Sequence, residues 1–235
     1  MFKQSQHISK QFEKELQAIH SQVLAMGGLV EQQATQAMEA LMTGDAELAR
    51  EVLTDDEEVN AQEVRIEEAC IQIIALRQPT ASDLRLVTGM LKAITDLERI
   101  GDEATRIARM AINLSEKDRP KRYYRELQNL GVHVRGMLRD ALDAFARFDV
   151  DMALSVARED EDVDIEYESL IRQLMTYMME DSRAITRVLD MMWSARSLER
   201  IGDHAHNVCE HIIYLVEGKN VRHLSIDNME KMIRG

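Results

Sequence analysis

The hexapeptide Leu97-Glu98-Arg99-Ile100-Gly101-Asp102 occurs twice in this chain, because Leu198-Glu199-Arg200-Ile201-Gly202-Asp203 repeats it without a change. The apolar pattern around the two copies also matches, since Met90 and Met191 stand at the same distance from their hexapeptides. An identical motif inside two matching apolar patterns indicates that the chain contains an internal duplication.

A second correspondence lies upstream of each hexapeptide. Residues 56–60 read Asp-Glu-Glu-Val-Asn, and residues 160–164 read Asp-Glu-Asp-Val-Asp. Two pairs of matching segments in the same order indicate a duplicated structural unit rather than a chance match of one short motif.

Apolar residues recur at helical spacing through almost the whole chain. Thr43-Gly44-Asp45 and Phe148-Asp149 read as turns, and Pro79 and Pro120 interrupt the helical pattern. The spacing predicts six long helices, the third capped by Thr80 or Ser82, over residues 9–42, 45–76, 82–114, 123–147, 150–179 and 181–217. Because short connections make successive helices antiparallel, we expect an all-α fold of two tandem antiparallel three-helix bundles. The bundles would occupy residues 1–118 and 119–218, and a short, partly ordered tail would follow at 219–235.

The composition suits long helices and excludes several classes of protein. Only 4% of the residues are aromatic while 45% are apolar, which favours a helical core over many short strands. A formal net charge of −13 opposes binding to nucleic acid or to an anionic membrane. Charges interrupt every apolar stretch, and Met1–Leu16 lacks the apolar region of a secretory signal. We therefore expect a cytoplasmic protein, with buried, unbonded thiols at Cys70 and Cys209.

The acidic residues of the hexapeptide are spaced to lie on one helix face. Glu98 and Asp102 are four residues apart, and two like charges at this spacing destabilise a helix by a few tenths of a kcal/mol. Gly101 adds to that cost, because a glycine inside a helix is about 1 kcal/mol less favourable than alanine and usually marks a close helix–helix approach. Each acidic pair is therefore expected beside a groove between helices, where a cation can compensate the repulsion.

The upstream segments are expected to form the other side of each groove. Carboxylate and amide oxygens from two helices are ligands for Mg²⁺, Mn²⁺, Ca²⁺ and ferrous iron. Zinc is also possible, because His204 adjoins the second motif. The candidate metal ligands are Glu98, Asp102, Asp56 and Asn60 in the first unit and Glu199, Asp203, Asp160 and Asp164 in the second.

Simpler interpretations remain open. An acidic pair can be an ordinary solvated face, with Arg99 and Arg200 pairing with nearby carboxylates. A di-iron oxidase needs two Glu-x-x-His pairs, whereas this chain offers only Asp203 with His206, a partly exposed histidine by prediction, and Thr105 stands at the matching position. No nucleophile elbow or phosphate-binding glycine loop is present, so we expect no enzyme. Four arginines flank the first motif, and they either form an anion-binding patch or make ordinary surface ion pairs. They are Arg77, Arg85, Arg106 and Arg109.

The segment Arg77–Arg85 (RQPTASDLR), the two hexapeptides and Val221-Arg222-His223 together closely resemble the PhoU family of bacterial phosphate-transport regulators. The resemblance implies tandem three-helix bundles that bind clusters of divalent or trivalent metal ions through Glu/Asp-x-x-x-Asp motifs. It also implies a homodimer that is a negative regulator of the phosphate regulon. The implied partners are the phosphate ABC transporter, through its ATPase subunit, and the membrane sensor histidine kinase.

Carried over by position, the family's motif residues are Glu98, Asp102, Glu199 and Asp203, with the upstream acidic residues facing them. The two units differ at two positions. Asp96 aligns with Ser197, and Asn60 aligns with Asp164. The first site has one negative charge fewer and is expected to bind metal more weakly. The alternative function is a metal-free helical interaction module that uses its acidic face.

Overall fold

The computed structural model describes residues 10–117 and 121–234, with side chains described from residue 124 onward in the second range. Within these ranges the chain is helical and has no strand. The α-helices are α1 (Lys10–Thr43), α2 (Ala46–Arg77), α3 (Ala81–Ser115), α4 (Lys121–Arg147), α5 (Val150–Glu180), α6 (Ile185–Glu217) and α7 (Ile226–Arg234). The all-α prediction is confirmed. Pro120, in the predicted central connection, lies outside the described residues.

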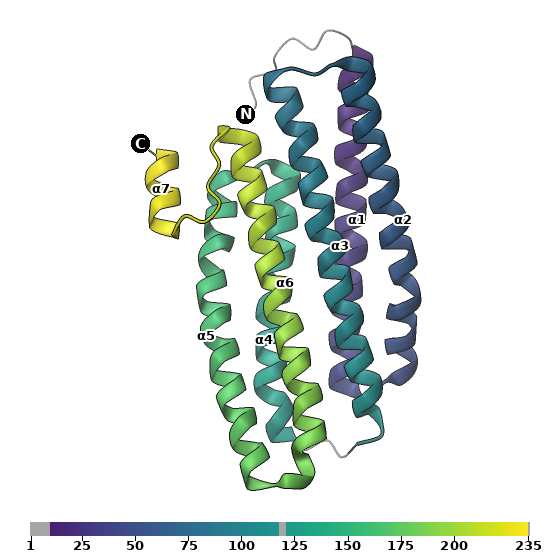
Figure 1. Cartoon of the computed structure of the whole chain (residues 1–235), viewed down its shortest axis with the longest axis vertical. Helices are drawn as coiled ribbons and strands as arrows, with labels where there is room; N and C mark the ends of the chain where they lie inside the picture. Colours follow the sequence, from purple (N-terminus) through teal and green to yellow (C-terminus); the bar gives the residue numbers. More distant parts are fainter. Residues whose placement is uncertain (1–9, 118–120, 235) are drawn as a thin grey trace.

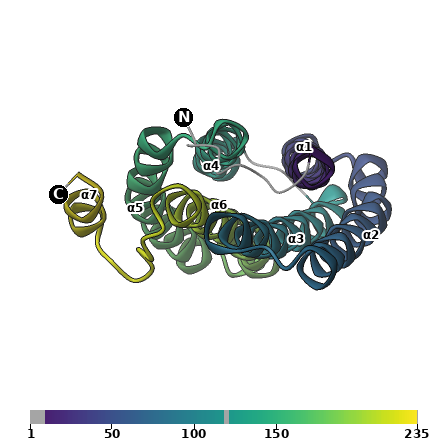
Figure 2. The same cartoon turned by 90° about the horizontal axis from the view of Figure 1, so that it is seen from above.

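The helices form two antiparallel three-helix bundles that lie side by side (Figure 1). Helices α1, α2 and α3 pack together, as do α4, α5 and α6. The bundles join mainly through α3 and α6, and α1 also packs on α4 (Figure 2). The duplicated fold is confirmed, and the two helices that contain the hexapeptides form the centre of the molecule.

The predicted turns follow from their capping residues. Gly44 adopts a φ of 80°, and the Asp45 carboxylate accepts hydrogen bonds from the backbone N–H groups of Glu47 and Leu48 at 3.0 Å. Asp149 caps α5 in the same way by accepting from the N–H of Met152 at 3.0 Å. These side chains satisfy backbone donors that have no partner inside the helix, which is why the helices begin there.

Three details differ from the sequence prediction. Helix α6 begins at Ile185 rather than at residue 181, because Asp181 caps a short 3₁₀ turn over Ser182–Ala184. Thr80 occupies the cap position of α3, but its side chain makes no capping hydrogen bond. The tail contains an ordered helix, α7, which packs on α5.

Helix α7 is held by apolar burial and one ion pair. Ile226 and Met229 are buried, and Arg158 of α5 binds Glu230 at 2.6 Å. Its nine residues contain only a few apolar positions, which left little pattern to predict from. A helix this short forms because α5 offers it a surface on which to pack.

The remaining general expectations concern the thiols and the membrane. Cys70 and Cys209 are free and buried, as predicted, and burial raises the pKa of the Cys70 thiol to about 12. Among the helices of the described ranges, none has an apolar stretch long enough to span a bilayer.

Candidate metal centres

Each hexapeptide glycine lies against the upstream acidic segment of its own bundle. A Cβ atom at Gly101 would lie 3.5 Å from Oδ1 of Asp56, and a Cβ at Gly202 would lie 3.5 Å from Oδ1 of Asp160. At that distance the carboxylate is in van der Waals contact with the position of the glycine, so the two segments face each other directly. In each bundle the hexapeptide therefore faces an acidic segment on the neighbouring helix, and we call these facing surfaces the first groove (α2–α3) and the second groove (α5–α6).

The first groove collects negative charge around Glu98. Burial raises the pKa of Glu98, and the charges of Asp102, Glu63 and Asp56 raise it further, while Arg99 opposes them. The carboxylates therefore repel one another in the absence of a cation.

Amide groups partly compensate that repulsion. Gln33 of α1 donates from Nε2 to Oδ1 of Asp56 at 3.0 Å, and Asn60 donates from Nδ2 to Oδ2 at 3.2 Å. Asp56 therefore has a hydrogen-bond donor on each oxygen. Asn60 serves here as a donor to a neighbouring carboxylate.

The second groove is more strongly perturbed. Glu199 is only 7% exposed, and burial together with the charges of Asp203, Asp164 and Asp160 raises its pKa to about 7. Burial and the charges of Asp160 and Asp164 also raise the pKa of Asp203. Arg196 pairs with one oxygen of Glu199 and only partly offsets the repulsion.

Two buried oxygens in the second groove have no hydrogen-bond partner among the described residues. They are Oε2 of Glu199 and Oδ1 of Asp160. Buried acceptors are almost always satisfied in folded proteins, so two orphans in one groove indicate a missing partner. A bound cation is one such partner, and the donor set fits it.

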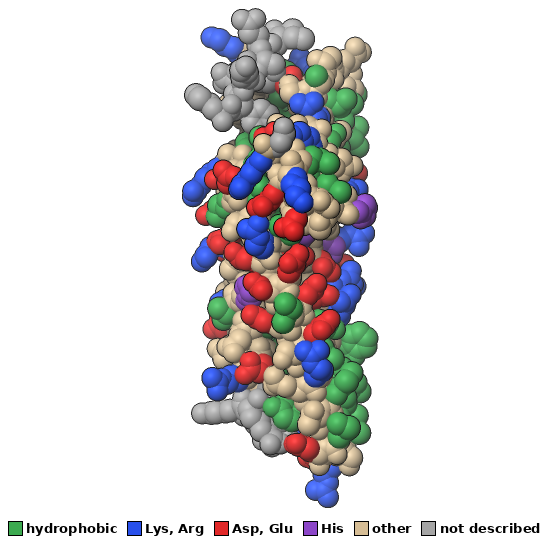
Figure 3. Space-filling model, turned by 90° about the vertical axis from the view of Figure 1, so that its left-hand side faces the viewer, with side chains coloured by type: hydrophobic (Ala, Val, Ile, Leu, Met, Phe, Trp, Pro, Cys, Tyr) green, Lys and Arg blue, Asp and Glu red, His purple; other side chains and the backbone are tan. Residues whose placement is uncertain are grey.

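An open hollow of about 490 Å³ adjoins Asp160. The residues around it are Asp160, Arg196, Arg200, Asp203, His204, His206 and Asn207. Figure 3 shows acidic side chains gathered across the middle of the second-bundle side of the molecule. Within residues 10–117 and 121–234, however, no three His, Cys, Asp or Glu side chains already stand as they would around one metal ion. Coordination would require some carboxylates to rotate.

Sequence reasoning missed a buried polar cluster between the bundles. Asp96 of α3 contacts three side chains of α6, namely Nδ1 of His204 at 2.9 Å, Nδ2 of Asn207 at 3.0 Å and Nε2 of His211 at 2.8 Å. Burial alone would raise the pKa of Asp96, but these hydrogen bonds outweigh it and lower the pKa. Asp96 and Ser197 occupy matching positions in the two repeats. Only Asp96 is a carboxylate that binds these side chains of the other bundle, so this difference between the repeats affects how the bundles associate. The spacing of the three α6 residues on one helix face was the available signal.

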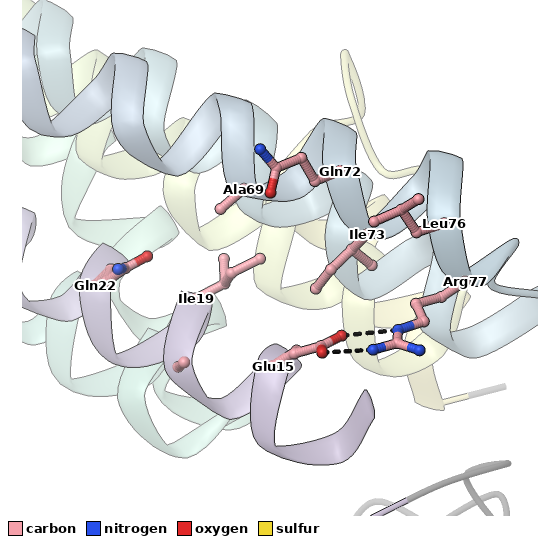
Figure 4. Close-up of a pocket in the computed structure, with 9 residues that line it drawn as sticks. Glu15, Ile19, Gln22, Ala69, Gln72, Ile73, Leu76 and Arg77 are labelled. Atoms are coloured by element: carbon pink, nitrogen blue, oxygen red, sulfur yellow. Dashed lines mark hydrogen bonds and ion pairs between the residues drawn. The ribbon is translucent and has the colours of Figure 1, made fainter. Parts of the chain in front are cut away.

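Two of the four arginines near the first motif, Arg77 and Arg106, form ion pairs. Arg106 binds Glu103 at 2.7 Å, and Arg200 reaches the same carboxylate across the α3–α6 interface at 3.1 Å. Arg77 binds Glu15 through two hydrogen bonds of 2.7 and 3.0 Å, at one end of a pocket of about 280 Å³ between α1 and α2 (Figure 4). Two arginines of the proposed anion patch are therefore paired with carboxylates.

The geometry defines a class of protein: a duplicated helical-bundle protein with an acidic groove in each bundle. A family model described as the PhoU domain matches residues 23–111 and again residues 127–212. The chain belongs to the PhoU family.

Relatives and solved structures agree with this assignment. The chain is 54% identical to a phosphate-specific transport system accessory protein PhoU homolog of Pseudomonas putida, over 97% of this chain and 90% of the relative. It is 51% identical to the phosphate-specific transport system accessory protein PhoU of Escherichia coli K12, over 98% and 95% of the two chains. The crystal structure of PhoU from Pseudomonas aeruginosa superimposes with a TM-score of 0.86 at 53% identity, covering 88% of this chain and 100% of that one.

A more distant structure shows the same fold. The phosphate transport system regulatory protein PhoU from Streptococcus pneumoniae has a TM-score of 0.83 at 32% identity, over 89% of this chain and 99% of that one. The bundle arrangement is therefore retained at much lower identity.

Proposed function

We propose that this protein is a phosphate-transport accessory protein and a negative regulator of the phosphate regulon, and that it binds metal ions in its two acidic grooves. Membership of the PhoU family supports the regulatory role. The single observation that supports metal binding best is Glu199, a buried carboxyl group with an unpaired oxygen beside three other carboxylates.

The residues that would hold the cations come from facing helices of each bundle. They are Glu98, Asp102, Asp56 and Asn60 in the first groove and Glu199, Asp203, Asp160 and Asp164 in the second. A bound cation supplies the positive charge that offsets their mutual repulsion. Divalent or trivalent ions fit these oxygen donors, with Mg, Mn, Fe and Zn as candidates. With the repulsion offset, α3 and α6 hold their grooves closed against α2 and α5.

The regulatory role requires docking surfaces rather than catalysis. The proposed partners are the ATPase subunit of the phosphate ABC transporter and the sensor histidine kinase, so that a phosphate-replete transporter inhibits the kinase and limits uptake. The protein would act in the cytoplasm as a homodimer and reach the membrane through these partners. Co-purification from phosphate-replete cells tests this part, and recovery of neither the transporter nor the kinase would contradict it.

Substitution of one motif carboxylate in each groove tests the metal sites. Asp102→Asn and Asp203→Asn remove a charged ligand with little change in shape, so each is expected to lower the bound metal per chain. Elemental analysis of the purified variants measures this directly. Wild-type stoichiometry in the double variant would rule out the grooves, whereas Asp83→Asn, outside both motifs, is the control.

The alternative is a metal-free interaction module. One observation favours it, because in the described part of the chain no three potential ligands are already gathered around a point, and acidic side chains face outward in Figure 3. A thermal melt with and without Mn²⁺ separates the two functions, because an ion that binds the folded state raises the melting temperature. An unchanged melting temperature at millimolar Mn²⁺ would favour the interaction module.

A further inference from the structure

Resting on the proposed metal binding, we infer that the second groove is a mixed nitrogen–oxygen site in which His206 is a ligand. This groove then prefers borderline divalent cations such as Zn²⁺ and Fe²⁺, whereas the first groove is an oxygen-only site for harder cations such as Mg²⁺ and Mn²⁺.

The first support is the direction of the His206 ring. Nδ1 lies 2.8 Å from Oδ2 of Asp160, and the side chain is only 18% exposed. Two donor atoms on one metal ion lie about 3 Å apart, given metal–ligand distances near 2 Å. His206 and Asp160 therefore already have about the separation of two ligands of one ion, with a hydrogen in the place of that ion. On metal binding that proton leaves to solvent.

The second support is the residue behind the ring. Nε2 of His206 faces the Glu210 carboxylate, whose Oε1 lies 3.9 Å away. Metal-bound histidines almost always point their other ring nitrogen at a carboxylate, carbonyl or water, which fixes the tautomer and the orientation of the ring. Glu210 is itself buried, so a carboxylate lies near the second ring nitrogen, and a shift of under about 1 Å would bring the two within hydrogen-bond distance.

The third support is an unsatisfied group that belongs to the same cluster of carboxylates. Glu199 is buried, and its Oε2 has no hydrogen-bond partner among the described residues. The charges of Asp160 and Asp203 act on it, and Asp160 is the carboxylate that His206 contacts. Together with Oδ1 of Asp160, Oε2 of Glu199 is a carboxylate oxygen that the ion pairs of this groove leave without a donor.

The first groove has neither a histidine at the position of His206 nor a carboxylate at the position of Glu210. Thr105 stands at the position of His206, and its hydroxyl donates to the backbone carbonyl of Asp102 at 2.8 Å. Arg109 stands at the position of Glu210. Imidazole suits Zn²⁺ and Fe²⁺, while carboxylates and carbonyls suit Mg²⁺, Ca²⁺ and Mn²⁺. The duplicated motif therefore serves two different classes of cation.

The test isolates each groove and compares two cations by calorimetry. Asp102→Asn leaves the second groove intact, and Asp203→Asn leaves the first. In the Asp102→Asn protein, His206→Thr is expected to reduce the preference for Zn²⁺ over Mn²⁺ by about tenfold or more. Conversely, in the Asp203→Asn protein, Thr105→His together with Arg109→Glu is expected to raise that preference. Zn²⁺ binds more tightly than Mn²⁺ at most sites, so the informative quantity is the change in the Zn²⁺/Mn²⁺ affinity ratio between two variants.

A second measurement identifies the ligand atom. Long-range ¹H–¹⁵N spectra of histidine-labelled protein, with His206 assigned by His206→Thr, are expected to show Zn²⁺ coordination at Nδ1. Zn²⁺ binding without a change at the His206 ring, or an unchanged Zn²⁺/Mn²⁺ ratio in His206→Thr, would overturn the inference and leave the proposed metal sites intact. Absence of any binding to the wild-type protein would overturn both. Thermal melts of each variant establish that it folds.

Discussion

The two grooves contain the same hexapeptide and yet differ in how their charge is compensated. In the first, Gln33 and Asn60 donate to Asp56, so both of its oxygens are satisfied. In the second, Met137 takes the place of Gln33 beside the hexapeptide glycine. Asp160 is left with one unpaired oxygen.

The glutamates of the two motifs differ as well, mainly through burial. The pKa of Glu199 is raised to about 7, and that of Glu98 is raised as well. The comparison shows that an identical motif does not define an identical site. Burial of the motif glutamate and the carboxylates around it, on its own helix and on the facing one, decide how much the groove gains from a cation.

The largest expected effect concerns the joint between the bundles. Asp96→Ala removes the acceptor of three α6 side chains and leaves buried histidine nitrogens unpaired, so it is expected to lower the free energy of unfolding by about 3 kcal/mol. Ser197→Ala, at the matching position of the second bundle, is expected to cost less than about 1 kcal/mol. Urea denaturation measures both, and equal effects would show that the two bundles are joined symmetrically.

The next effect concerns pH in metal-free protein. The unfolded Glu199 has its ordinary pKa near 4.5, while the folded one titrates at about 7. Between these values the folded state holds more protons, so the contribution of this group is present at low pH and is lost as pH rises through about 7. Glu199→Gln is therefore expected to be more stable than wild type by about 2 kcal/mol at pH 8.5.

Glu98→Gln is the matched control in the first groove and is expected to give a smaller gain. Melting temperatures between pH 5 and pH 9, in the presence of a chelator, measure both variants. A larger gain from Glu98→Gln would reverse the ranking of the two grooves.

The smallest expected effect comes from making the first groove more like the second. Asn60→Asp adds the negative charge that Asp164 supplies in the other bundle, and it removes a donor to Asp56. The second groove is disabled in both proteins by Asp203→Asn. In that background, the Asn60→Asp variant is expected to bind Mn²⁺ about tenfold more tightly than the protein with Asn60. Calorimetry measures the affinity, and an unchanged value would mean that residue 60 does not face the ion.

Sequence reasoning was sufficient for the fold because the helix boundaries follow from local chemistry. Asp45 and Asp149 cap the helices they precede, and Gly218 ends α6 with a φ of 68°. Duplication then placed the same elements in both halves. Helix α7 escaped prediction because its stability depends on packing against α5, which no local pattern records.

The candidate site was predicted only in part, for a similar reason. Spacing within one helix brought Glu98 and Asp102 together, and the repeat identified the segments that face them. The contacts of Asp96 with His204 and His211, and of His206 with Asp160, join residues far apart in the chain. Such contacts depend on how α3, α5 and α6 are oriented, which a single sequence does not specify.

The placement of α3 and α6 has a mechanical consequence. Next to Asp102 in the chain is Glu103, which binds Arg200, and next to Asp203 is His204, which binds Asp96. Each groove therefore shares a helical turn with a contact that clamps the opposite bundle. An axial rotation of α3 or α6 that opens one groove therefore strains a tie to the other central helix, so a displacement in one bundle acts on the other.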